Sequence, residues 1–197
     1  RNTSRNPRMA TKEIFRIYIT PDLPLHEKYS NEKHPEFLEQ YKNFAGDKNT
    51  IIEHIVGETV KRLWATAEEP YAYKGAGGDE IADNRILEVT TASGKFILYL
   101  KDLASGAMIK SIVDRGKRNA IRRAVAEGKE AFLLTADLCL AVEQEMDENE
   151  ELPNTEVDVQ RWLEIQGRRE RVRGVKSFMD ERKKKKEAEQ PVDTVTT

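Results

Sequence analysis

Cysteine, long apolar runs and net charge are all scarce in this 197-residue chain. Cys139 is its single cysteine, so no disulfide can form within the chain, and we expect a reducing, cytoplasmic compartment. No apolar run approaches the roughly 20 residues that span a bilayer, and no signal peptide opens the chain. The formal net charge of −2 argues against a general nucleic-acid binder. Because the chain begins at Arg1 in a polar stretch, we expect a fragment.

The motifs that carry phosphate, metal or nucleophilic chemistry are also missing. No G-x-x-x-x-G-K-[ST] segment occurs, and no apolar strand ends in an acidic pair that would hold Mg²⁺. The glycine-rich stretch Gly75–Gly78 runs directly into Asp79 and Glu80, whose carboxylates would repel a phosphate. The three histidines show no zinc-like spacing with Cys139, and Cys139 lies on the apolar side of an expected helix. We therefore expect a packed thiol, no metal site and no catalytic residues.

Charged residues make up 35% of the chain and hydrophobic residues 38%, which indicates a small core with solvated helices and tails. The hydrophobic pattern predicts a mainly helical α+β fold with one β-hairpin. The expected helices are 6–19, about 49–67, 105–128, one starting at Thr135, and 155–165; the expected strands are 85–91 and 95–100. Residues 70–83 are rich in turn formers, residues 168–189 are dominated by charge, and we expect disorder from about residue 180.

Capping residues mark the ends of two of these helices. Ser105 and Gly128 are suitable caps for the strongest helix, which has one apolar side and many basic residues elsewhere. Thr155 followed by Asp158 resembles a capping box, although Asp is the weaker choice at its last position.

Four segments between residues 10 and 173 together resemble a known family. Leu103–Ile109 is similar to the S-G-A-[DM]-[ILV] element that opens a helix in the small subdomain, or lid, of classical AAA ATPases. The other three are Thr11–Tyr18, similar to the first lid helix; Asp83–Thr90 with Gly94 and Tyr99–Asp102, similar to an inserted hairpin; and Leu152–Thr155 with Trp162 and Gly167, similar to a closing segment. The combination resembles the actinobacterial proteasome-associated ATPases, the ARC or mycobacterial proteasome ATPase family.

The resemblance implies a part of an enzyme. Members of this family are homohexamers that recognise proteins tagged with prokaryotic ubiquitin-like protein, unfold them with ATP, and feed them to the proteasome core. The chain would then comprise the lid at 1–152 with the hairpin at about 85–100, a C-terminal extension at 153–179, and a disordered tail at 180–197. ATP phosphates and Mg²⁺ would be bound by a large subdomain outside this chain, so the chain alone should be inactive. The alternative is a non-catalytic, lid-like adaptor or interaction module.

The resemblance also implies which residues contact the adenosine side of the nucleotide. Ser105, Gly106 and Ala107 would lie at a helix N-terminus beside the adenine and ribose, where a glycine lets the base approach the backbone. Ile14 and Tyr18, four apart on one helix face, align with the lid positions that flank adenine. Two simpler readings stay open: Ser105 is only a helix cap, and Ile14 and Tyr18 are only core residues.

Two features depart from the family pattern. Family members typically end in Gly-Gln-Tyr-Leu, which docks on the proteasome core, whereas this chain ends in Val192–Thr197, similar to the stretch before that motif. The run from Arg182 to Lys186 is also more basic than the family pattern predicts. A solvated tail is the default interpretation of this run, with binding to an acidic surface or nucleic acid as the alternative. We expect no membrane partner and no specific nucleic acid.

Overall fold

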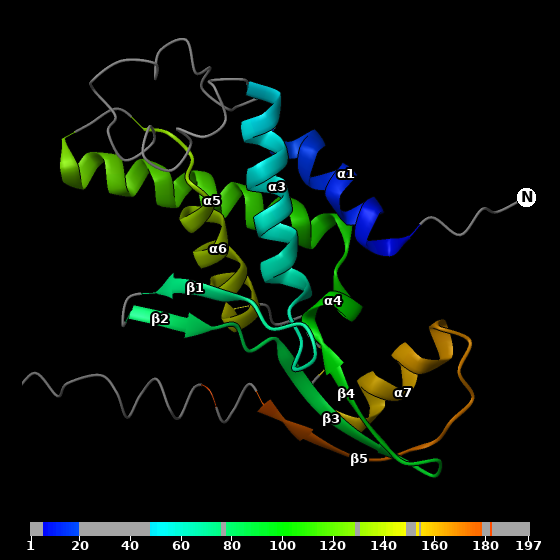
Figure 1. The fold of residues 1–197 in the computed structure, drawn as a ribbon. Coiled ribbons are helices and arrows are strands. Elements are labelled where there is room, and N and C mark those ends of the chain that lie inside the picture. The colour runs from blue at the N-terminus through cyan, green and yellow to red at the C-terminus, as the bar shows by residue number, and fades with distance from the viewer. Residues whose placement is uncertain are drawn as a thin grey trace, which may run out of the picture. The chain divides into compact units, whose positions relative to one another are not determined.

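The computed structural model describes residues 6–19, 48–75, 78–128, 131–148, 153, 155–178 and 182 (Figure 1). The chain divides into two compact units, and each is made from two separate stretches of sequence. Unit 1 comprises Arg1–Asp83 and Ala104–Glu145, and unit 2 comprises Asn84–Leu103 and Met146–Thr197. The mainly helical α+β fold predicted from the sequence is confirmed.

Unit 1 is built from helices around an apolar centre. Its helices are α1 (Pro7–Ile19), α3 (Lys48–Trp64), α5 (Gly106–Glu127) and α6 (Thr135–Glu148), of which α6 continues past the unit boundary. α1 packs against both α3 and α5. The core consists of aliphatic and aromatic side chains at helical spacing, including Phe15, Ile19, Ile55, Val60, Leu63, Ile112, Leu138 and Val142. α3 ends at Trp64, one turn before the predicted end near Ala67.

Helix α5 has both of the caps that the sequence predicts. The Ser105 side chain accepts a hydrogen bond from the Met108 N–H (3.2 Å), and Gly128 adopts the left-handed conformation with φ of 64°. An L side chain is strained at such a φ, which explains the glycine there. Gly116, in the middle of α5, allows α5 and α6 to pack closely. A Cβ at this position would lie 2.5 Å from the Leu138 Cδ2 atom on α6.

Polar side chains along α5 hold α6 in register. Arg123 donates to the Asp137 carboxylate at 3.0 Å and to the Phe132 carbonyl at 2.8 Å. About two turns further along α6, Glu145 accepts a hydrogen bond from Arg115 at 2.9 Å. Both carboxylate side chains are less than one tenth exposed, and these partners satisfy oxygens that burial removes from water.

A second hairpin lies in the stretch 70–83, which the sequence presented only as turn-rich. Strands β1 (Ala72–Gly75) and β2 (Gly78–Ile81) pair antiparallel, with Ala72 opposite Ile81. Each strand has only four residues, and Gly75 and Gly78 lie at the ends next to the turn. The sequence therefore shows no alternating apolar pattern that would predict these strands.

Unit 2 is a three-stranded antiparallel sheet with helix α7 (Glu156–Ile165) against it. The strand order is β4 (Lys95–Tyr99), β3 (Arg85–Thr91) and β5 (Val172–Ser177), so β3 is central. The predicted hairpin is confirmed, and its second strand ends one residue early because Leu100 begins the short helix α4 (Leu100–Leu103). Val159 and Leu163 of α7 are buried together with the apolar side chains Ile86, Leu87, Val89, Leu98, Val172 and Phe178.

The segment from Arg168 to Arg182 contacts the β3–β4 hairpin at both of its ends. Near the hairpin turn, Thr91 donates to the Glu170 carboxylate (3.2 Å), and the Arg168 guanidinium lies 4.9 Å from the Phe96 ring centre. At the opposite end of β3, Arg182 donates to the Arg85 carbonyl oxygen at 2.5 Å. Strand β5 pairs with β3 between these two points.

Residues 168–178 correct the interpretation of the charged stretch after Gly167. The sequence assigned it no regular structure, yet β5 forms there because β3 supplies a partner strand. The predicted cap of α7 is present: Thr155 Oγ1 accepts from the Asp158 N–H (3.2 Å), and Asp158 accepts from the Thr155 hydroxyl (2.6 Å). The expectation of disorder at 180–197 falls outside the described residues, except at Arg182, as does the segment 20–47.

We predict that Gly116→Val lowers the free energy of unfolding by about 1–3 kcal/mol, because the new side chain must displace buried Leu138. The measurement is urea denaturation of the 197-residue chain followed by circular dichroism.

Gly57→Val on α3 is the matched control, since a Cβ there meets nothing within 4 Å. Its expected change is within about 0.5 kcal/mol, because valine and glycine differ little in helix propensity. Equal losses in the two variants would show that the α5–α6 contact does not determine the effect.

Candidate nucleotide-binding site

The first predicted site element, Ser105–Ala107, lies where α5 begins and is exposed. Ser105 has extended backbone angles (φ −112°, ψ 164°), and its carbonyl accepts from the Ile109 N–H at 3.0 Å, as expected for an N-cap. A Cβ built on Gly106 meets nothing within 4 Å, so the space beside this glycine is open. No acidic residue occupies the first turn of α5, which leaves its partially positive N-terminal end uncompensated by the helix's own side chains.

The second element, Ile14 and Tyr18, lies on α1 beside the core. Phe15 and Ile19 are fully buried and Thr11 is nearly so, whereas Ile14 and Tyr18 are only half-buried. The interior line of α1 therefore runs through Thr11, Phe15 and Ile19. Ile14 and Tyr18 flank this line, with part of each side chain available to solvent or to a ligand.

The packing of α1 on α5 brings the backbone of Tyr18 close to the fourth turn of α5. Lys117 of α5 donates to the Tyr18 carbonyl oxygen at 3.3 Å, at the C-terminal end of α1 where cations are favourable. Lys110 donates to Asp114 at 2.6 Å. Asp114, and to a smaller extent Tyr18, raise the pKa of Lys110, so the Lys110 side chain is positively charged at neutral pH.

Lys110 and Lys117 were not among the residues predicted from the sequence. Helical spacing could have found Lys110, which lies four positions after Gly106 and therefore on the same face of α5. Lys117 could not have been found in this way, because its relation to Tyr18 depends on how α1 packs. A nucleotide contact by Ser105, Gly106, Ala107, Ile14 or Tyr18 stays a prediction.

Metal ligands and the single cysteine are the other candidates for a chemical role in the described part of the chain. No group of three or more His, Cys, Asp or Glu residues there could hold a metal ion. Cys139 is 3% exposed, and burial raises the pKa of its thiol to about 11, which agrees with the predicted packed thiol. Of the three histidines only His54, half-buried on α3, is described. The described helices include none that is long and apolar enough to cross a bilayer.

Comparison with known proteins gives a family match over nearly the whole chain. The family model described as "ARC, AAA+ ATPase lid domain" matches residues 7–197.

Curated relatives named proteasome-associated ATPase align along the same range. The protein from Saccharopolyspora erythraea is 36% identical over 189 residues, which cover 95% of this chain and 27% of that protein. The protein from Saccharomonospora viridis is 35% identical over 187 residues, covering 94% of this chain and 26% of that protein. The protein from Mycolicibacterium gilvum is 37% identical over 158 residues, covering 80% and 21%. The chain thus spans about a quarter of the length of these relatives.

The burial of Cys139 predicts a thiol that reacts only when unit 1 opens. At pH 8 the raised pKa lowers the thiolate fraction on the order of a hundredfold relative to an ordinary thiol, and the side chain is also inaccessible. Labelling with an aromatic disulfide reagent should therefore be slow in buffer and should increase along the urea unfolding curve. Rapid stoichiometric labelling of the folded chain at pH 8 would contradict the buried position.

Proposed function

This chain belongs to the ARC AAA+ ATPase lid-domain family, and from this premise we propose that it is the lid and C-terminal part of a ring-forming, ATP-driven protein unfoldase. The relatives' name, proteasome-associated ATPase, supports ATP hydrolysis and a proteasome partner. The sequence resemblance adds the finer parts of the proposal: a homohexamer, substrates tagged with prokaryotic ubiquitin-like protein, and delivery of the unfolded substrate to the proteasome core.

The proposal divides the work between this chain and the rest of the ATPase. The chain corresponds to about a quarter of the length of its relatives. Its sequence contains neither a phosphate-binding loop motif nor an apolar strand that ends in an acidic pair for Mg²⁺. ATP phosphates and Mg²⁺ are therefore assigned to a large subdomain outside this chain. In AAA ATPases that subdomain supplies the hydrolytic chemistry, because phosphoryl transfer needs metal and positioned charges.

The lid's own part is to contact the adenosine side of the nucleotide. One arrangement carries this assignment: the open start of α5 at Gly106 and the half-buried Tyr18 belong to two helices that pack together. A base or ribose beside Gly106 could reach the backbone without meeting a side chain. Nucleotide binding and hydrolysis would then change the forces on α1 and α5 together, and so move these two packed helices.

We expect the isolated 197-residue chain to bind ATP only with a dissociation constant on the order of millimolar, equivalent to about −4 kcal/mol. Phosphate and Mg²⁺ contacts supply most of the affinity in such sites, and this chain leaves them to the large subdomain. Isothermal calorimetry on the isolated chain measures this directly. Micromolar affinity would overturn the assignment of the phosphates to a missing subdomain.

In the complete ATPase we predict that Gly106→Asp raises KM for ATP at least about tenfold, equivalent to roughly 1.4 kcal/mol if KM follows affinity. The reason is that the new side chain enters space assigned to the base or ribose. The fold should not suffer, since that space is otherwise open and a carboxylate in the first turn of a helix is favourable by about 0.3–1 kcal/mol. The measurements are steady-state ATPase kinetics and Tm without nucleotide.

Two variants serve as controls for this experiment. Gly106→Asn has nearly the same volume without charge and should raise KM to a similar extent; a rise with Asp alone would place the phosphates beside Gly106. Ser105→Ala removes the cap and should cost about 1 kcal/mol of stability with a smaller effect on KM. If neither residue 106 variant changes KM, Ser105–Ala107 is only a helix start.

A further inference from the structure

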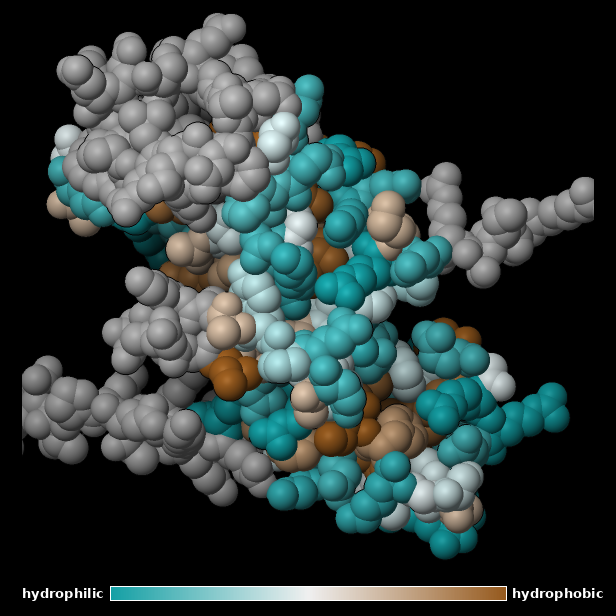
Figure 2. Space-filling model, in the orientation of Figure 1, coloured by the Kyte–Doolittle hydropathy of each residue, from teal (hydrophilic) through white to brown (hydrophobic). Residues whose placement is uncertain are grey.

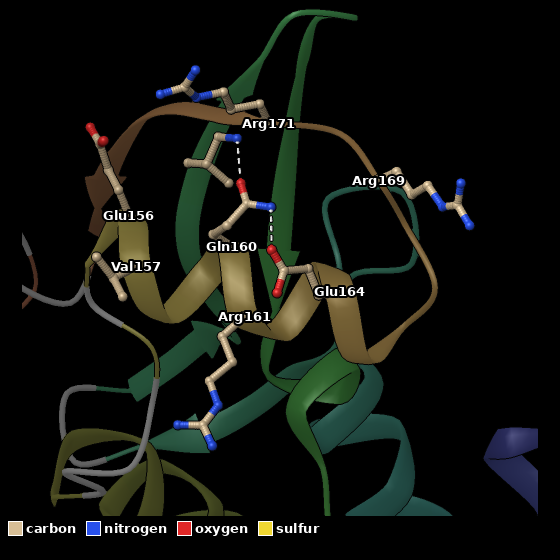
Figure 3. Close-up of a pocket in the computed structure, with 8 residues that line it drawn as sticks. Glu156, Val157, Gln160, Arg161, Glu164, Arg169 and Arg171 are labelled. Carbon is tan, nitrogen blue, oxygen red and sulfur yellow. Dashed lines mark hydrogen bonds between the residues drawn. The ribbon is translucent and has the colours of Figure 1, made fainter.

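A shallow groove in unit 2 lies between helix α7 and the chain segment that enters strand β5. It has a volume of about 640 Å³, within the range of ligand pockets. Figure 3 shows its two sides: Glu156, Val157, Gln160 and Glu164 along α7, and Arg169 and Arg171 on the segment opposite. The Gln160 side chain joins the sides, because its oxygen accepts from the Val172 N–H (2.9 Å) and its nitrogen donates to Glu164 (3.0 Å).

Strand β5 forms one edge of the sheet. Among the described residues it pairs with β3 on one side and with no strand on the other. An edge strand presents unpaired N–H and C=O groups that can hydrogen-bond an added strand. A Cβ on Gly174 would meet only the Glu156 carboxylate, at 4.0 Å, so little covers the face of β5 at this position. The Val172 N–H is already bonded to Gln160, so a docked strand would pair from Arg173 onward.

Arginines at alternate positions follow this edge. Arg169, Arg171 and Arg173 are spaced two residues apart and are all exposed, whereas Val172 between them is buried. Arg173 belongs to β5, where the register with β3 shifts between Gly174 and Val172, and Arg169 and Arg171 lie on the segment that precedes the strand. Figure 2 shows the surface over β5 and α7 as hydrophilic residues interleaved with smaller apolar areas.

The charges of these three arginines are not neutralised within the described part of the chain. No ion pair or side-chain hydrogen bond joins their guanidinium groups to any described residue. Of the nearby acidic side chains, Glu170 contacts Arg168 and Thr91, and Glu164 accepts from Gln160, whereas Glu156 lies on the α7 side of the groove close to Gly174. Between residues 161 and 176 the sequence carries six basic residues and two acidic ones, so an acidic partner is favoured.

We propose that the β5 edge and the adjoining α7 groove bind an extended, acidic peptide segment of a partner protein. The peptide adds to the sheet as a further strand beside β5 from Arg173 onward, and it continues along the groove, where its carboxylates pair with the guanidinium groups of Arg169, Arg171 and Arg173. Val157, which is 76% exposed on α7, contacts an apolar side chain of the peptide. A peptide is favoured over nucleic acid because the strand edge offers backbone pairing, and because the chain's net charge of −2 does not attract polyanions in general.

The test is fluorescence anisotropy of the complete 197-residue chain with three labelled probes, without nucleotide. The first probe is acetyl-(Glu-Val)4-amide, which has alternating carboxylates and all its backbone donors. Acetyl-(Glu-Pro)4-amide has the same charge but lacks every second N–H, and a twelve-nucleotide oligothymidine offers a polyanion without a peptide backbone. We expect the first probe to bind at least about tenfold tighter than the other two, and to weaken as salt rises.

Variants then place the binding at the groove. Arg169→Glu/Arg171→Glu/Arg173→Glu should weaken the (Glu-Val)4 peptide at least about tenfold, because it reverses the charges that face the peptide. Val157→Glu, on the helix side, should weaken it at least about threefold. The control Arg118→Glu/Arg122→Glu reverses exposed arginines on α5 in unit 1 and should change affinity by less than about twofold. Hydrogen exchange of the β5 amides should slow on binding.

Several outcomes would overturn the proposal. These are no binding of (Glu-Val)4, equal binding of (Glu-Pro)4, tighter binding of oligothymidine, or unchanged affinity in the arginine variant. Since no arm uses ATP or the remainder of the ATPase, a negative result leaves the proposed function of the lid intact. Equally, failure of the Gly106 experiments does not affect this one.

Discussion

The pairing of β3 with β5 is the contact on which unit 2 depends. Leu87 lies opposite Ser177 and Val89 opposite Val175, so the ladder joins two stretches that lie far apart in sequence. A two-stranded hairpin is at best marginally stable in water, and a third strand or a packed helix is needed for independent stability. The C-terminal stretch supplies both, because α7 and β5 come from the same segment. The inserted hairpin and the C-terminal extension are therefore one structural unit, although the family pattern presents them as separate additions to a lid.

Unit 1 depends in a comparable way on one long helix. α5 packs on α1 through apolar side chains and bonds α6 through Arg115, Asn119 and Arg123. Buried carboxylates at Asp137 and Glu145 stabilise this arrangement only while their arginine partners remain, so the polar contacts define register as well as add energy. The start of the same helix is free of acidic residues and open at Gly106. One helix thus combines the packing centre of the unit with its candidate ligand-binding end.

The parts of the fold that could be predicted from the sequence are those with a local cause. Ser105 and Gly128 define α5 because a hydroxyl cap and a left-handed glycine act within one turn of the chain. The hairpin of β3 and β4 was predictable from two apolar runs around Ala92–Gly94. Strand β5 was not, since its apolar residues Val172 and Val175 do not alternate and its strand state comes from pairing with distant β3. The same distinction applies to the candidate site. The segment Ser105–Ala107 could be predicted from a sequence motif, whereas the contact between Lys117 and Tyr18 depends on tertiary packing.

The division of each unit between two stretches of sequence also sets an order of events during synthesis. When β3 and β4 leave the ribosome, the strand that completes their sheet has not yet been made. Ser177 follows Leu87 after roughly 5–20 seconds of translation. During that interval the β3 edge is available to other chains or to chaperones. α1 and α3 must likewise wait for α5, which emerges after the hairpin has passed. A nascent chain that stalls before β5 therefore exposes the unpaired edge of β3, which can pair with other chains. The rate of translation through α7 thus affects how much of the protein aggregates.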